Sequence, residues 1–263
     1  MTADSPVRYS VSGGVATITL DRPEQKNRLD AAGMAALLAH LQAAAADESV
    51  RVVVLTGTGS TFCAGADLSS AVAADADAFT GSGPQALVAV LEAMLDHPKP
   101  IVGRVQGHVA GGGNGLVAAC DIAVADAGAR FAFSEVRVGV APAVISVVCL
   151  RRMHLSDGYE LLLTGERVDA ERVRQAGLVA RVAETEALDA TVQAYVDALL
   201  LGGPQALTRT KELLRRVPSM DRAEAFAWTA ELSAALFTSE EAREGMTAFL
   251  TKRPPAWAPP PPA

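Results

Sequence analysis

The sequence has no cluster of basic residues, and its 263 residues carry a formal net charge of −7, which argues against nucleic acid as a partner. It has only three cysteines, and Cys63, Cys120 and Cys149 fit neither a disulfide nor a zinc spacing. We therefore expect a reducing cytoplasm and no metal site. No apolar run approaches the roughly 20 residues of a membrane helix, and the first ten residues contain no signal-peptide core. We expect a soluble chain with no membrane partner.

Half of the residues are hydrophobic, which is enough to bury a sizeable core. In the first 150 residues, β-branched runs alternate with segments rich in alanine and leucine, and this order predicts an α/β fold with a largely parallel sheet. After a hairpin over 9–20, the predicted strands are 50–56, 101–105, 121–125 and 130–133. The predicted helices among them are 29–46, with Asp30 as its N-cap, 86–95 and 114–120.

Beyond residue 156 the strand pattern almost vanishes, while the helical pattern continues. The predicted helices there are 159–163, 170–176, 188–201, 204–217, 222–236 and 240–250. The chain then ends in a proline-rich tail, which cannot continue a helix and is predicted to be disordered. The sequence thus predicts a strand-rich core followed by a helical C-terminal part.

Two glycine-containing segments each follow a predicted strand and lead toward a helix: TFCAGADL over 61–68 and AGGGNG over 110–115. Glycine lets the backbone approach a ligand closely, and the start of a helix leaves N–H groups free. Two such groups that converge on one point can stabilise an oxyanion. Each segment alone is also compatible with an ordinary turn. A phosphate-binding loop is disfavoured because no Lys-Ser/Thr pair follows the glycines.

Six segments give a more specific pattern when they are taken together. They are LDRPEQKNRLD (20–30), FCAGADL (62–68), GHVAGGGNGLVAACDIAVA (107–125), FSEVRVGVAP (133–142), LTGERVDAERVRQAGLVARV (163–182) and EEAREGMTAFLTKRPPAW (240–257). In this order they resemble the enoyl-CoA hydratase/isomerase family, also called the crotonases, over about residues 7–257. Within it, SEVRVGVAPAVIS is nearest in pattern to the bacterial methylglutaconyl-CoA and isohexenylglutaconyl-CoA hydratases.

The resemblance implies the α/β, ClpP-like crotonase spiral of ββα units with a helical C-terminal trimerisation region. It places the core in residues 1–197, the helical region in 198–257 and the disordered tail in 258–263. It also implies an acyl-CoA substrate, no cofactor apart from the coenzyme A that the substrate carries, and a homotrimer or a hexamer of two trimers.

The resemblance also implies an active site. The family's oxyanion-hole donors correspond to the N–H groups of Ala66 and Gly112, which would stabilise the enolate of the thioester. A typical hydratase of the family places two glutamates around one water. The first corresponds to Gly115 here and the second to Glu135, so only one carboxylate remains. Ala143 is a second departure, because many hydratases have a glycine there.

One carboxylate is compatible with several functions. If other groups hold the water, Glu135 could act as both base and acid in an enoyl-CoA hydratase, which is the function we expect. Without water, the same residue could transfer a proton between C4 and C2, as in a Δ3,Δ2-enoyl-CoA isomerase. The chain could also be a non-catalytic acyl-CoA-binding protein, an alternative that Gly115 and Ala143 leave open.

The remaining candidates are residues that, by the resemblance, would bind the coenzyme A part of the substrate. They are Lys26, Arg28, Ala64, Asp67, Leu68, Phe249 and Lys252. Lys26 and Arg28 could meet the phosphates or be solvated surface charges, and Asp67 could instead cap a helix. By resemblance, Phe249 and Lys252 reach the coenzyme A of a neighbouring subunit. If the acyl group carries a free carboxylate, one of Arg137, Arg151 and Arg152 could pair with it.

Overall fold

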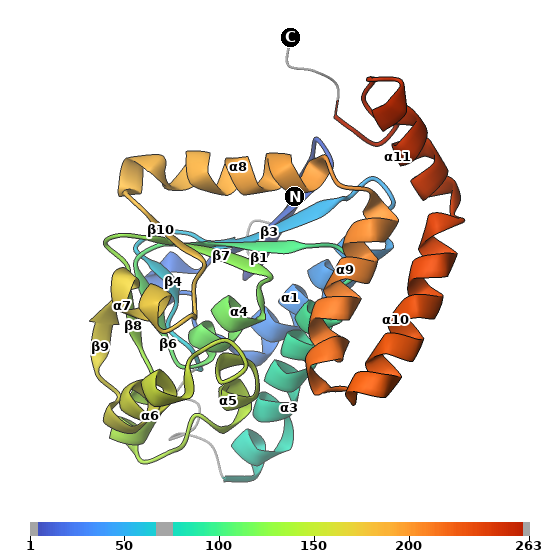
Figure 1. Ribbon diagram of the computed structural model, residues 1–263. Coiled ribbons are helices and arrows are strands. Elements are labelled where there is room, and N and C mark those ends of the chain that lie inside the picture. Colours follow the sequence, from blue (N-terminus) through green and yellow to red (C-terminus); the bar gives the residue numbers. More distant parts are fainter. Residues whose placement is uncertain (1–4, 67–75, 260–263) are drawn as a thin grey trace.

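The computed structural model describes residues 5–66 and 76–259, and the strands of this part form two sheets (Figure 1). The larger sheet has the strand order β1 (Val7–Ser12), β2 (Val15–Leu20), β3 (Val52–Gly57), β5 (Ile101–Val105), β7 (Ile122–Asp126) and β10 (Arg181–Ala183). The smaller sheet has the order β4 (Thr61–Cys63), β6 (His108–Ala110), β8 (Arg130–Ala132) and β9 (Arg167–Asp169). Neighbouring strands are parallel except in the outer pairs β1–β2 and β8–β9, so the predicted α/β class with a largely parallel sheet is confirmed.

The strands of the larger sheet are buried on both faces. In β3, Val53 and Leu55 belong to one hydrophobic core, whereas Val52 and Val54 belong to the other, because successive side chains of a strand point to opposite faces. The helix α8 (Leu188–Leu200) covers the face of Val52 and Val54. The opposite face is covered by α1 (Ala31–Ala46), α3 (Ala76–Leu95) and α4 (Gly112–Ala119) (Figure 1).

The chain repeats one unit, in which a strand of the larger sheet precedes a strand of the smaller sheet and then a helix. The successive units are β3–β4–α3, β5–β6–α4 and β7–β8–α5, where α5 is Ala143–Cys149. This is the ββα repeat that the crotonase spiral implies. The other helices of this region are α6 (Leu155–Thr164) and α7 (Ala170–Gln175), and the 3₁₀ segments of the chain are η1 (Pro23–Gln25), η2 (Ser134–Val138), η3 (Thr185–Ala187) and η4 (Val217–Ser219). As predicted, Asp30 caps α1, since its Oδ1 accepts from Gly33 N at 2.7 Å.

Three helices form a C-terminal arm at one side of the molecule: α9 (Pro204–Arg216), α10 (Arg222–Phe237) and α11 (Glu240–Leu250) (Figure 1). Two charged side chains, Arg51 and Glu241, hold the two ends of this arm in place. The Arg51 guanidinium donates to the carbonyl of Gly202 at 2.6 Å and to that of Trp257 at 3.1 Å. The Glu241 carboxylate accepts from the first N–H groups of α9, at Gln205 and Ala206, at 2.8 Å each.

Several elements differ from the sequence prediction. The strands β9 and β10 lie beyond residue 156, and β4 and β6 lie at 61–63 and 108–110; no strand was predicted at any of these places. Each has only three residues, too few to show a periodic pattern. The helix α5 was also missed, and α3 begins at Ala76, not at residue 86, because the chain accommodates Pro84 inside the helix.

The division at residue 197 stays a prediction, and the position falls inside α8. The predicted disorder of 258–263 is likewise untested, and residues 260–263 lie outside the described part. Within that part, no helix is long and apolar enough to cross a membrane.

Candidate active site

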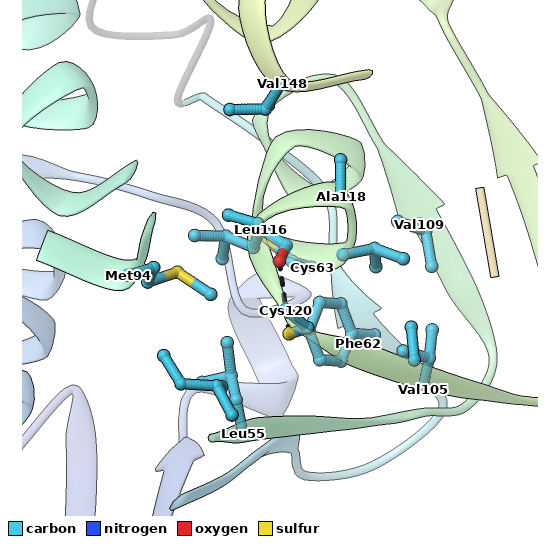
Figure 2. Close-up of a cluster of buried hydrophobic side chains, with 14 of the residues drawn as sticks. Leu55, Phe62, Cys63, Met94, Val105, Val109, Leu116, Ala118, Cys120 and Val148 are labelled. Carbon is cyan, nitrogen blue, oxygen red and sulfur yellow. Dashed lines mark hydrogen bonds between the residues drawn. The ribbon is translucent and has the colours of Figure 1, made fainter. Parts of the chain in front are cut away.

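The glycine segment forms the start of α4, a short helix in the middle of the core. Gly111 is its N-cap and has φ +51°, a left-handed conformation that favours glycine. All eight residues of α4 are buried. Figure 2 shows Leu116 and Ala118 of this helix packed among Phe62, Val105 and Val109 from the strands around it. The helix that begins at Gly112 is therefore held rigidly by the core.

The second glycine segment contacts the first one directly. A Cβ atom added at Gly65 would lie 2.8 Å from Ala110 O and 3.1 Å from Gly112 N. Gly65 also has φ +82°, and its carbonyl accepts from Leu29 N at 2.8 Å. Ala66, the next residue, therefore lies beside the start of α4. Among the described residues, no acceptor takes a hydrogen bond from the N–H of Ala66 or that of Gly112.

Gly113 makes the contact between α4 and β4 possible. A Cβ atom at this position would lie 2.5 Å from the carbonyl oxygen of Cys63 and 3.0 Å from its Cβ. Only glycine allows the two backbones to come this close. The Cys63 side chain itself is fully buried, and burial raises the pKa of its thiol to about 12, so that it serves as a small packing residue and not as a nucleophile.

Glu135 lies in η2 and reaches the start of α4. A Cβ atom added at Gly111 would be 3.6 Å from Glu135 Oε1. The other carboxylate oxygen, Oε2, is buried and has no hydrogen-bond partner in the described residues. Burial raises the pKa of this carboxyl above its ordinary value. The arrangement thus combines one carboxylate, held in a poorly solvated place, with two N–H groups on adjacent segments.

Gly115 corresponds to the first glutamate of a typical hydratase, and core side chains occupy the space that a side chain at this position would need. A Cβ atom added at Gly115 would lie 2.7 Å from Ile145 Cγ2 and 3.6 Å from Leu91 Cδ1. Ile145 comes from α5 and is 3 % exposed. Sequence analysis did not identify Ile145, because no local pattern shows which side chain will pack on a glycine 30 residues away.

The substrate-binding candidates fall into three groups. Lys26 and Ala64 lie on neighbouring segments, since Ala64 N donates to Lys26 O at 3.0 Å; Lys26 is exposed and Arg28 is half-buried. Asp67 and Leu68 lie outside the described residues.

Phe249, at the end of α11, and Lys252, just beyond it, are exposed. They lie on the C-terminal arm, away from α4 of the same chain (Figure 1).

Two of the three arginines that could recognise a substrate carboxylate have other contacts. The Arg152 guanidinium donates to the carbonyls of Ala118, Cys120 and Asp121 at the C-terminal end of α4, so the hypothesis is wrong for Arg152. Arg137 donates to Thr164 O at 3.1 Å from an exposed position. Among the described residues, no group of three or more His, Cys, Asp or Glu side chains is placed to hold a metal ion.

The comparisons with known proteins agree with this architecture. The model of the enoyl-CoA hydratase/isomerase family matches residues 10–260, and the chain belongs to this family. A 2,3-dehydroadipyl-CoA hydratase of Escherichia coli is 33 % identical over 92 % of this chain and 94 % of its own. An (E)-benzylidenesuccinyl-CoA hydratase of Thauera aromatica is 30 % identical over 96 % and 98 %. The crystal structure of an enoyl-CoA hydratase of Mycobacterium smegmatis has a TM-score of 0.91 at 35 % identity, over 97 % of this chain and 99 % of the other.

Proposed function

We propose that the chain is an enoyl-CoA hydratase that adds water to a 2-enoyl-CoA thioester with Glu135 as its single acid and base. The observation that carries the proposal is the position of the Glu135 carboxylate beside Gly111, next to the two N–H groups of Ala66 and Gly112 that lack acceptors in the described residues. The hydratase names of the similar proteins support water addition as the reaction.

In the proposed reaction, the water oxygen forms a bond to C3 of the substrate while Glu135 takes a proton from that water. The electrons of the double bond move toward the thioester oxygen, which accepts hydrogen bonds from Ala66 N and Gly112 N. Each such donor contributes about 3–4 kcal/mol in comparable sites. Glu135 then returns the proton to C2, and the 3-hydroxyacyl-CoA leaves. The reaction takes no cofactor, because coenzyme A is part of the substrate.

A Δ3,Δ2-enoyl-CoA isomerase is the second candidate, and Gly115 favours it. Since Ile145 fills the space at this position, Glu135 is the only carboxylate that we assign to the reaction. A single base is sufficient to take a proton from C4 and return it to C2. The two candidates use the same three residues and differ only in whether water is added.

The deciding experiment is a paired assay of the wild type and Glu135→Gln on crotonyl-CoA, 3-methylglutaconyl-CoA and a 3-enoyl-CoA. Formation of 3-hydroxyacyl-CoA and of 2-enoyl-CoA is measured separately. We expect the wild type to hydrate, and the variant to lose about 10²–10⁴-fold in kcat. Glu186→Gln, an exposed carboxylate of η3, is the matched control and should keep wild-type activity. A double-bond shift without hydration would favour the isomerase, and binding without turnover would favour an acyl-CoA-binding protein.

We also propose that the chain works as a homotrimer, or as a hexamer of two trimers. The support comes from the C-terminal arm, where Phe226 is 71 %, Phe237 70 % and Phe249 82 % exposed within the chain. Large exposed apolar side chains of this kind mark protein interfaces. In the assembly, Phe249 and Lys252 would reach the coenzyme A of a neighbouring subunit, while Lys26 and Arg28 would meet it in their own subunit.

Sedimentation analysis tests the assembly. The wild type should sediment as a multiple of three subunits, and replacing both Phe226 and Phe237 by Asp should release monomers. Wild-type monomers would contradict the proposal. The cytoplasmic location stays a prediction.

A further inference from the structure

Two side chains, the candidate base Glu135 and the apolar Ile145 of α5, lie against the start of α4. Gly111 is the N-cap of this helix, and Gly115 is the fourth of its residues. Glu135 Oε1 lies 3.6 Å from where a Cβ atom at Gly111 would be, and Ile145 Cγ2 lies 2.7 Å from where one at Gly115 would be. Glu135 and Ile145 therefore occupy successive places along the start of this helix.

Ile145 is held firmly in its place. It is 3 % exposed, and Val148, one turn further along α5, is also 3 % exposed. The thiol of Cys149 lies against α4 and contacts Asn114 O at 3.7 Å. Leu91 of α3 closes the same space from the other side, with its Cδ1 3.6 Å from the added Cβ. A side chain at position 115 would thus have to displace a buried isoleucine from a close-packed core.

We infer that Ile145 keeps the site to one carboxylate, because it occupies the space that a side chain at position 115 needs. The inference rests on the proposed function, because it concerns how Glu135 performs that reaction. With one carboxylate, the same group must take the proton and return it. We expect a kcat/KM that rises with pH as Glu135 ionises and then stays level. A second carboxylate at 115 becomes possible only when residue 145 is small.

The packing is tested by a double-mutant cycle in Tm with Gly115→Ala and Ile145→Ala. The added methyl group overpacks the site, and we expect Gly115→Ala to lower Tm by roughly 3–10 °C. In the double variant the nearest remaining atom is the Cβ of residue 145, at 3.3 Å. The double variant should therefore lose clearly less than the sum of the single losses. Val148→Ala, on the same helix and equally buried, is the matched control. The Tm loss of Gly115→Ala combined with Val148→Ala should equal the sum of the two single losses. If the Tm losses of Gly115→Ala and Ile145→Ala also simply added up, the inference would be overturned.

The consequence for catalysis is tested with Gly115→Glu, alone and combined with Ile145→Ala. We expect Gly115→Glu alone to lower Tm and hydrate crotonyl-CoA poorly. The double variant should hydrate it at least about tenfold faster than Gly115→Glu alone. Its kcat/KM should also show a second ionisation, which better packing alone would not produce.

Two outcomes would contradict the inference. One is that Gly115→Glu alone has the same Tm, hydration rate and pH profile as Gly115→Glu combined with Ile145→Ala. The other is that this double variant folds but its kcat/KM shows only one ionisation. By contrast, full hydratase activity in Glu135→Gln would refute the proposed function while leaving the Tm cycle valid, so the two failures are distinguishable.

Discussion

The helices α4 and α10 are both rich in small apolar residues, but their surroundings are opposite. Every residue of α4 is buried, whereas α10, which is described along its whole length, has no buried residue. In α4, Gly113 lets the backbone of β4 come close, because a Cβ atom there would lie 2.5 Å from Cys63 O. In α10, Phe226 and Phe237 are 71 % and 70 % exposed.

The difference shows that hydrophobic content alone does not decide where the site is built. The candidate oxyanion hole needs N–H groups in fixed positions. The core can hold them because its glycines allow neighbouring backbones to pack closely. The arm presents its apolar side chains to the outside, as expected for a surface that another subunit covers. The candidate site therefore lies in the core, and under the proposed assembly the arm would contribute to the site of a neighbouring subunit.

The comparison is tested most strongly by adding one methyl group in each region. We expect Gly113→Ala to destabilise the chain by more than about 3 kcal/mol, because its Cβ would lie 2.5 Å from a backbone carbonyl that cannot move independently. Turnover should also fall, by about 10²-fold or more, as the adjacent Gly112 donor shifts. Gly245→Ala in α11 is the counterpart. Its Cβ would meet only the edge of Trp257, at 3.0 Å, and alanine favours a helix by about 1 kcal/mol.

Urea unfolding and turnover, measured on both variants, distinguish the two positions. The arm variant should keep its activity, and its free energy of unfolding should change by no more than about 1 kcal/mol. Equal losses in the two variants would mean that the arm is packed as tightly as the core.

Removing a side chain should show the same contrast, with a smaller effect on activity. Leu116 in α4 is fully buried, and Leu116→Ala should lower the free energy of unfolding by about 2–5 kcal/mol. Leu214 in α9 is 73 % exposed, and Leu214→Ala should change it by no more than about 0.5 kcal/mol. The measurement is urea unfolding at one fixed protein concentration, because subunit assembly contributes to apparent stability. A large loss for Leu214→Ala would indicate that assembly buries this residue.

Much of the core could be predicted from the sequence, because its signals are local. The strands β3, β5 and β7 are predominantly apolar segments, and Asp30 comes directly before the residues that it caps. The family resemblance also predicted Glu135, Ala66 and Gly112 as one site. The structure places Glu135 beside Gly111 and Gly65 beside Gly112 N, and the roles of the three residues stay predictions.

The parts that could not be predicted depend on contacts distant in sequence. The strands β9 and β10 have three residues each and exist because a neighbouring strand is there to pair with them. Ile145 fills the space at Gly115 from a different helix. Arg152, which looked available for a substrate carboxylate, is used to satisfy the carbonyls at the end of α4. Each of these depends on the packing of separate elements.

The two regions should also respond oppositely to pH, through one carboxylate in each. Burial raises the pKa of Glu135 above its ordinary value of 4.5, so its contribution to stability is lost as pH rises from 4.5 through the raised pKa. In the arm, hydrogen bonds from Arg253 and from Ala256 N lower the pKa of Glu244 to about 2. The contribution of Glu244 is therefore present above pH 4.5 and is lost as pH falls toward 2.

At neutral pH, we expect Glu135→Gln to unfold at a higher temperature than the wild type, and Glu244→Gln at a lower one. Both differences should shrink in acid: that of Glu135→Gln disappears as pH falls to about 4.5, and that of Glu244→Gln decreases as pH falls from about 4.5 toward 2. Thermal unfolding of the two variants and the wild type between about pH 2 and about pH 8 checks this. If Glu135→Gln lowered Tm at neutral pH, Glu135 would not be the poorly solvated carboxylate that the proposed mechanism requires. A stabilised Glu135→Gln that has also lost turnover would show that this position gives up stability in order to keep its base.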